Sequence, residues 1–128
     1  MRRVYADTSC FLAIALEQPG FENTAEQLES YEAVHSSTLM EAELRAKLHQ
    51  QGVQEDGSRL TCWVEWVAPP RPLHVYIGRV LLQGVALKGA DVWHLACALY
   101  AAERYSDIEF ISLDRKQVET ARRLGFAG

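Results

Sequence analysis

The chain has 128 residues, of which 48% are hydrophobic and 23% charged, and its net charge is −4. This composition is typical of a globular protein and excludes a disordered or fibrous one. A single domain over residues 1–128 is long enough to bury roughly two-thirds of its surface. The acidic balance argues against tight nonspecific binding to a nucleic-acid backbone, although acids that hold a metal would contribute to it.

The cysteines and the hydropathy pattern predict a cytoplasmic protein. The cysteines are widely spaced and include no Cys-x-x-Cys pair, as expected of reduced thiols. They are Cys10, Cys62 and Cys97. Acids interrupt the first apolar segment, which argues against a signal peptide, and no apolar run reaches the length of a membrane span.

The first half of the chain predicts alternating strands and helices. Val4, Tyr5 and Ala6 form a short apolar run, typical of a buried strand, which stops at Asp7. Ser9 is the expected N-cap of the apolar helix that follows. We expect that helix over residues 10–17, a surface helix over 21–32, a second strand over 33–36 and a helix over 39–50.

The second half continues this alternation. Residues 58–67 predict a helix, whose inward-facing residues are expected to be Leu60, Trp63, Val64 and Val67. A proline-rich linker over 69–72 leads into a helix over 73–83. The expected buried face of that helix is Tyr76, Ile77, Val80 and Leu81. A helix over 91–104, a strand over 110–113 and a helix over 115–124, closed by Gly125, follow.

Strands separated by helices predict an α/β fold with a central, mostly parallel sheet and helices on both faces. Two of the expected strands lead to an acid, Asp7 after the first and Asp114 after the last. The carboxyl ends of parallel strands lie at one edge of a sheet, where ligands bind. If these strands are neighbours, their carboxylates share that edge. Asp91, beside the buried stripe of its helix, and Glu43, one turn into its helix, offer further carboxylates.

Carboxylates a few Å apart repel one another, so such a cluster requires a divalent cation or the protonation of some of the acids. Oxygen ligands without a histidine or cysteine partner select a hard ion, Mg²⁺ or Mn²⁺. An ion of this kind activates water and stabilises an in-line displacement at phosphorus. The pattern therefore indicates a phosphoryl-transfer site.

Each acid also has a purely structural interpretation. An aspartate after a strand is often a turn or cap residue, and Asp91 suits the positive end of a helix dipole. Glu41 competes with Glu43 for the inward position, but Arg45 at i+4 is a natural surface partner for Glu41, which favours Glu43. His94 has a spacing from Asp91 that can serve a metal, but a lone histidine on an alanine-rich helix is more often packed and hydrogen-bonded, which is the interpretation we take.

The order and spacing of these residues resemble the PIN-domain (PilT N-terminus) ribonucleases, and most closely the VapC-type toxins of bacterial toxin–antitoxin pairs. The resemblance spans the chain and is carried by residues 4–9, 36–45, 88–99 and 110–114 and by the tail 121–126. It implies a PIN-like three-layer α/β/α sandwich. It also implies a Mg²⁺ or Mn²⁺ site made of Asp7, Glu43, Asp91 and Asp114.

The family's glutamate precedes a leucine, which agrees with Glu43-Leu44 rather than Glu41-Ala42. The resemblance implies that Thr8 and Ser9 help to orient the first aspartate or a metal-bound water, and Ser112 stands where relatives carry threonine or serine.

Some relatives carry a further acid shortly after the last aspartate, where this chain has Arg115 and Lys116, so the number of metal ions stays open. We expect these two cations to hold RNA phosphates beside the site. Arg45 and Lys88 are further candidates for contacts with RNA.

The resulting hypothesis is a metal-dependent endoribonuclease, the toxin of a type II toxin–antitoxin pair, in which metal-activated water attacks RNA. The resemblance also implies a homodimer and a cognate antitoxin protein that blocks the cleft, with an arginine that competes for the acids. The alternative is a catalytically silent PIN-like binding module. An aspartyl-phosphate phosphatase with Asp7 as nucleophile is disfavoured, because that chemistry prefers a second aspartate where this chain has Ser9.

Overall fold

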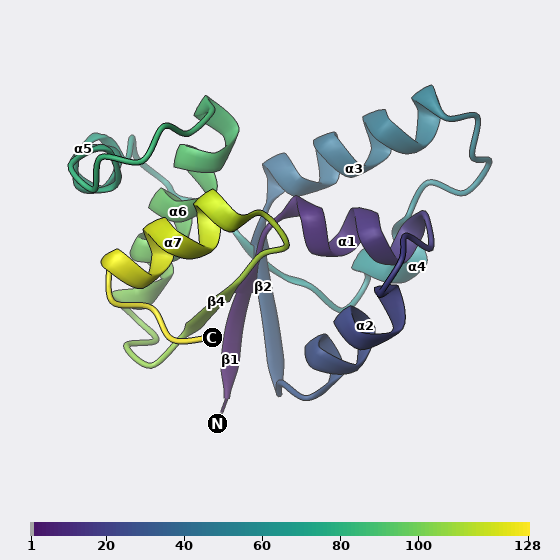
Figure 1. Ribbon diagram of the computed structural model, residues 1–128, viewed down its shortest axis with the longest axis horizontal. Coiled ribbons are helices and arrows are strands. Elements are labelled where there is room, and N and C mark those ends of the chain that lie inside the picture. Colours follow the sequence, from purple (N-terminus) through teal and green to yellow (C-terminus); the bar gives the residue numbers. More distant parts are fainter. Residues whose placement is uncertain (1) are drawn as a thin grey trace.

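A sheet of four parallel strands forms the middle layer of the protein in a computed structural model, which describes residues 2–128 (Figure 1). Helices cover both faces of the sheet, so the predicted α/β/α sandwich is confirmed. The spatial order of the strands is β3-β2-β1-β4. Their bounds are Arg3–Ala6 for β1, Ala33–Ser37 for β2, Glu65–Val67 for β3 and Glu109–Ile111 for β4.

The central strand β1 is buried on both faces, as expected for a parallel sheet between helical layers. Its side chains alternate between the faces. Val4 and Ala6 join one apolar cluster, while Tyr5 joins the other. An unbroken apolar run is therefore the pattern that this strand requires.

Four helices cover the face of Val4 and Ala6 (Figure 1). They are α1 (Thr8–Ala15), α2 (Phe21–Glu29), α3 (Thr38–Gln50) and α4 (Ser58–Thr61). Phe11 of α1 and the stripe of Met40, Leu44 and Leu48 on α3 are buried against this face. The apolar spacing along α3 thus fixes which side of that helix meets the sheet.

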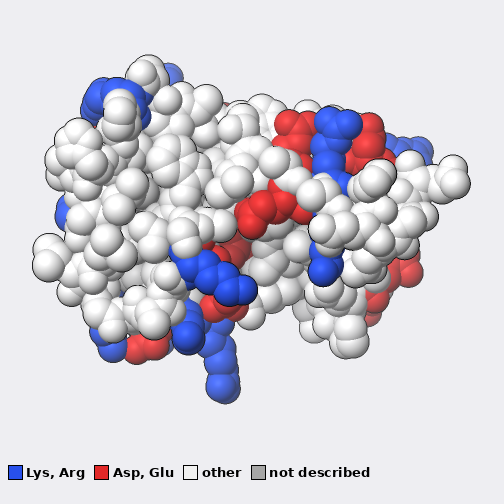
Figure 2. Space-filling model, turned by 90° about the horizontal axis from the view of Figure 1, so that it is seen from above, with Lys and Arg blue, Asp and Glu red and all other residues white. Residues whose placement is uncertain are grey.

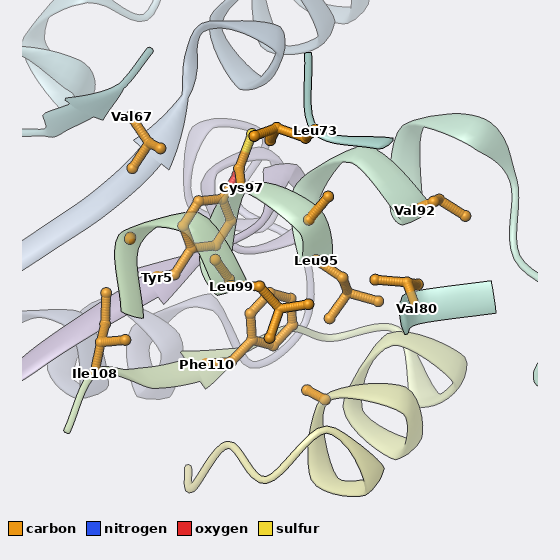
Figure 3. Packing of buried hydrophobic residues seen from close by; sticks show 14 residues of the cluster. Tyr5, Val67, Leu73, Val80, Val92, Leu95, Cys97, Leu99, Ile108 and Phe110 are labelled. Carbon is orange, nitrogen blue, oxygen red and sulfur yellow. The ribbon is translucent and has the colours of Figure 1, made fainter. Parts of the chain in front are cut away.

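The opposite face, that of Tyr5, is covered by α5 (His74–Leu81), α6 (Gly89–Ala102) and α7 (Arg115–Arg123). Figure 3 shows Tyr5 and Phe110 beside Leu95 of α6 and Val80 of α5. The rings of Tyr5 and Phe110 stack with their centroids 5.7 Å apart. Because α6 is apolar almost all round, it is buried between the sheet and its neighbouring helices.

The direction of the strand order reverses at the carboxyl ends of β1 and β4. The chain proceeds from β1 through β2 to β3 on one side and returns to place β4 on the other side of β1. A reversal of this kind marks the position where open α/β sheets bind their ligands. The Asp7 N–H still donates to the Ile111 carbonyl at 3.4 Å, so the two strands stay together up to Asp7.

The prediction of one helix over residues 58–67 is wrong. The segment forms only the single turn α4 and then β3, which pairs in parallel with β2 from His35↔Glu65 to Ser37↔Val67. Val64 and Val67 are buried as predicted, but Trp63 is exposed. Pairing with β3 gives hydrogen-bond partners to the backbone groups along the outer edge of β2. A helix over these residues would leave those groups without partners.

Smaller differences concern element ends. Asp7, not Ser9, stands at the N-cap position of α1, and Ser9 lies inside the helix. Leu81 is exposed although it was predicted on the buried face of α5, because the helix ends there; Val80 is buried as predicted.

Gly125 closes α7 with a positive φ of 99°, as expected. Beyond it the tail returns along the outside of β4, where the Phe110 N–H donates to the Ala127 carbonyl at 2.9 Å. Within the described part of the chain, no helix is both long and apolar enough to cross a membrane.

Leu95 tests the core on the α6 side. It is 0% exposed, so Leu95→Ala should lower the free energy of unfolding by about 2–5 kcal/mol, through lost burial and the cavity left behind. Val53→Ala is the control, because Val53 is 37% exposed after the end of α3 and its truncation should lower stability much less than that of Leu95. Equal losses in urea-induced unfolding would contradict this packing.

Candidate active site

Asp7 is the most buried acid of the site and lies where β1 meets α1, with 4% of its surface exposed. It makes no cap hydrogen bond to α1. Its Oδ1 instead accepts the Ser9 hydroxyl at 2.5 Å, and its Oδ2 accepts the Ser112 hydroxyl at 2.7 Å. Burial raises the pKa of Asp7 above its usual value, and these hydrogen bonds oppose that rise.

The same two hydroxyls tie the loop after β4 to the start of α1. The Leu113 N–H donates to Ser9 Oγ, and the Asp114 N–H donates to Ser112 Oγ, both at 2.9 Å. Ser9 and Ser112 therefore hold Asp7 and the two strand ends in one hydrogen-bonded unit. Their placement beside Asp7 agrees with the supporting role that the family resemblance implies.

Glu43 of α3 turns toward this edge of the sheet. Its Oε1 accepts the Thr8 hydroxyl at 2.6 Å and lies 3.0 Å from Nε2 of His94. Its neighbour Glu41 pairs instead with Arg45 across one helical turn, at 3.8 Å. The hydrogen bond with His94 lowers the pKa of Glu43, and partial burial works against this. Glu43 is therefore held as a carboxylate.

His94 is the buried link behind Glu43. It is 2% exposed, and its Nδ1 lies 2.8 Å from the hydroxyl of Tyr5, deep in the sheet. Complete burial raises the pKa of Tyr5, so its hydroxyl keeps its proton and can donate to Nδ1. Nε2 then carries the imidazole proton and donates to Glu43. The packed, hydrogen-bonded histidine predicted from the sequence is thus also the residue that orients Glu43.

Asp91 and Asp114 complete the set of predicted acids. Asp91 lies in the first turn of α6, and burial, followed by the charge of Asp114, raises its pKa. Asp114 is exposed and caps α7, since its Oδ1 accepts the backbone N–H groups of Lys116 at 2.8 Å and Gln117 at 3.3 Å. Asp114 is therefore a helix cap and, at the same time, a negative charge close to Asp91.

Gln117 is the residue that sequence reasoning missed. It is 0% exposed on the inner face of α7, and its Nε2 lies 3.4 Å from Asp7 Oδ2 and 3.3 Å from Asp91 Oδ1. Its Oε1 is buried without a hydrogen-bond partner, a situation that costs about 1–3 kcal/mol. A polar residue in the inward register of α7, with Thr120 and Ala121, is the signal that could have identified it.

The acids lie in a hollow at the carboxyl edge of the sheet. Figure 2, which looks onto this edge, shows acidic side chains between two halves of the molecule, with Lys and Arg side chains nearby. The predicted RNA contacts are all exposed, namely Arg45, Lys88, Arg115 and Lys116. Of these, Arg45 is engaged with Glu41, while Arg115 and Lys116 occupy the first turn of α7, directly after Asp114.

The structure brings the predicted acids together in pairs. Gln117 joins Asp7 to Asp91, the charge of Asp114 acts on Asp91, and Glu43 reaches the site through Thr8 and His94. Within residues 2–128, no three His, Cys, Asp or Glu side chains form a ready metal-binding group.

The protein is a parallel α/β sandwich that carries carboxylates at the point where its strand order reverses, which is where proteins of this architecture bind their ligands. A family model described as "PIN domain" matches residues 4–123. The chain therefore belongs to the PIN domain family, whose members are typically nucleases, and its fold is of the nuclease type. None of the curated proteins compared with the chain matches it.

The raised pKa of Asp91 gives a pH-dependent prediction for the protein in a metal chelator. The folded state holds the proton of Asp91 more tightly than the unfolded state, so ionised Asp91 destabilises the fold at neutral pH. This penalty disappears as the pH falls toward 3.8, the ordinary pKa of an aspartate. Asp91→Asn should therefore raise the melting temperature at pH 7, with a gain that shrinks as the pH falls. The exposed Asp107→Asn serves as control, and a loss of stability at pH 7 would contradict the prediction.

Proposed function

We propose that this protein is a metal-dependent endoribonuclease and the cytoplasmic toxin of a type II toxin–antitoxin pair. The observation that carries the proposal is the meeting of Asp7 and Asp91 on either side of the Gln117 amide, with Glu43 and Asp114 beside them. Carboxylates are brought together in this way when a hard cation completes the site.

The residues fit Mg²⁺ or Mn²⁺. All the charged ligands offered by Asp7, Glu43, Asp91 and Asp114 are carboxylate oxygens, the donors that hard ions prefer. Magnesium is usually held by one or two carboxylates together with waters and substrate phosphates, so paired acids suffice. A bound ion of this type supplies an activated water and offsets the charge that develops on the phosphate.

The chain's own groups have separate tasks in this proposal. Ser9 and Ser112 fix the Asp7 carboxylate, while Thr8 and His94 fix Glu43. Both hydrogen bonds to Glu43 fall on Oε1, so Oε2 is left to orient a water and accept its proton. Because the pKa of Glu43 is lowered, this carboxylate is ionised at neutral pH and ready for that task.

Two surfaces support the proposed protein partners. A cavity of about 410 Å³ lies beside α1, α2 and α4, and its lining includes Ile14, Leu28, Leu60 and Trp63. This apolar surface is the proposed binding site for an antitoxin side chain. The exposed residues Val75, Leu81 and Leu82 at α5 offer an apolar patch for a second copy in a homodimer.

The environment of Asp7 disfavours the phosphatase alternative. A nucleophilic carboxylate needs an oxygen that faces the substrate, whereas both oxygens of Asp7 accept hydroxyl groups inside the protein.

Calorimetry with Mn²⁺ and Mg²⁺ tests the site directly. Asp7→Asn and Asp91→Asn should each weaken binding by at least about tenfold, since even the loss of a partner behind a metal ligand typically costs 10- to 100-fold. Glu41→Gln is the matched control, because this acid pairs with Arg45 on the same helix as Glu43, and it should bind as the wild type does. If the wild type binds no metal, or both variants bind equally well, the silent binding module becomes the better interpretation.

RNA binding tests the cations at the start of α7. Arg115→Ala combined with Lys116→Ala should weaken binding of a single-stranded RNA and reduce its salt dependence, because phosphate contacts release counterions. Arg2→Ala with Arg104→Ala removes the same charge at the opposite end of the fold. Arg2 precedes β1, whose other end leads to Asp7, and Arg104 follows the 14-residue helix α6, about 21 Å long, whose first turn holds Asp91. Equal losses in the two double variants, measured by fluorescence anisotropy, would remove the proposed contact.

A further inference from the structure

The Gln117 side chain contacts the carboxylates of two candidate metal ligands. Its Nε2 lies 3.3 Å from Asp91 and 3.4 Å from Asp7, and its backbone N–H reaches a third acid, Asp114. These contacts come from α7, whereas the acids belong to α6, the end of β1 and the start of α7 itself. The amide thus stands where the carboxylate oxygens of Asp7 and Asp91 converge.

Packing alone does not account for a glutamine at this position. The side chain is 0% exposed, and its Oε1 has no hydrogen-bond partner. A leucine or methionine would fill a similar volume without burying a lone acceptor. The amide is therefore favoured by its two N–H groups, one for each carboxylate.

We propose that Gln117 is a positioning residue that takes the place of the cation in the metal-free protein. Its amide holds Asp7 and Asp91 at one spacing against their mutual repulsion, and a bound Mg²⁺ or Mn²⁺ displaces it from them. The second half of this inference rests on the proposed function, because it requires a metal ion at these carboxylates.

The proposal has an unusual consequence for metal affinity. A group that stabilises only the metal-free state competes with the ion, so its removal should tighten binding. Gln117→Met keeps the length and apolar volume of the side chain but has no N–H group. We expect it to melt at a lower temperature in chelator and to bind Mn²⁺ about 3- to 10-fold more tightly by calorimetry, the factor that one ordinary hydrogen bond corresponds to.

Thr120→Val is the matched control for this experiment. Thr120 is also 0% exposed on the inner face of α7, but its hydroxyl donates to the Lys116 carbonyl at 2.7 Å and contacts no acid. Its replacement should lower stability without changing Mn²⁺ affinity. Gln117→Asn, one methylene shorter, should change Mn²⁺ affinity in the same direction as Gln117→Met but by less. Unchanged or weaker Mn²⁺ binding by Gln117→Met would overturn the proposal while leaving the metal site intact.

A measurement without metal separates this inference from the proposed function. If the amide offsets repulsion between carboxylates, Gln117→Met should lower the melting temperature in chelator much less in the Asp91→Asn background than in the wild type. This result would support the positioning role even if the wild type bound no metal. The same loss in both backgrounds would show that Gln117 is an ordinary packing residue and would overturn the proposal.

Discussion

The carboxylate of Asp7, buried at the carboxyl end of an inner strand, is the constraint on which the rest of this structure depends. Asp7 follows the buried strand β1 and is itself 4% exposed, and taking its charge out of water is costly unless donors replace the lost hydration. The donors come from three segments: Ser9 on α1, Ser112 after β4 and Gln117 on α7. The position of β4 beside β1 and the docking of α7 over their ends are therefore linked to one side chain.

A second chain of hydrogen bonds runs from the core to the same edge. It passes from Tyr5 through His94 to Glu43 and Thr8, and so connects the face covered by α6 with the face covered by α3. The two helical layers contact each other beyond the end of β1, where His94 of α6 lies 3.0 Å from Glu43 of α3. This contact explains why acids from distant parts of the chain lie together at the carboxyl edge of the sheet.

Much of this arrangement could be predicted from local patterns. The apolar run before Asp7 indicated a buried strand, and the alternation of strands and helices indicated the parallel sandwich. The preference for Glu43 over Glu41 followed from the i+4 spacing of Glu41 and Arg45, a pair that the structure contains. The roles proposed for the four acids in binding metal stay predictions.

What sequence reasoning could not supply depends on contacts between distant segments. Residues 65–67 become a strand because β2 offers them a partner, which no local pattern of apolar residues reveals. Ser9 looks like a helix cap, yet its hydroxyl is taken by Asp7. Gln117 appeared to be one polar residue among many on an amphipathic helix, and only the position of α7 over Asp7 and Asp91 gives it a function.

The tail after α7 also affects which backbone groups at the edge of the sheet are open to another strand. By accepting the Phe110 N–H, Ala127 covers a backbone donor on the outer edge of β4, and Gly128 lies so close that a Cβ there would stand 2.6 Å from the Phe110 carbonyl oxygen. Exposed sheet edges are templates for strand addition and aggregation. The tail thus covers part of the β4 edge, and at the other edge of the sheet β3 has only three residues and offers a short ladder to a further strand.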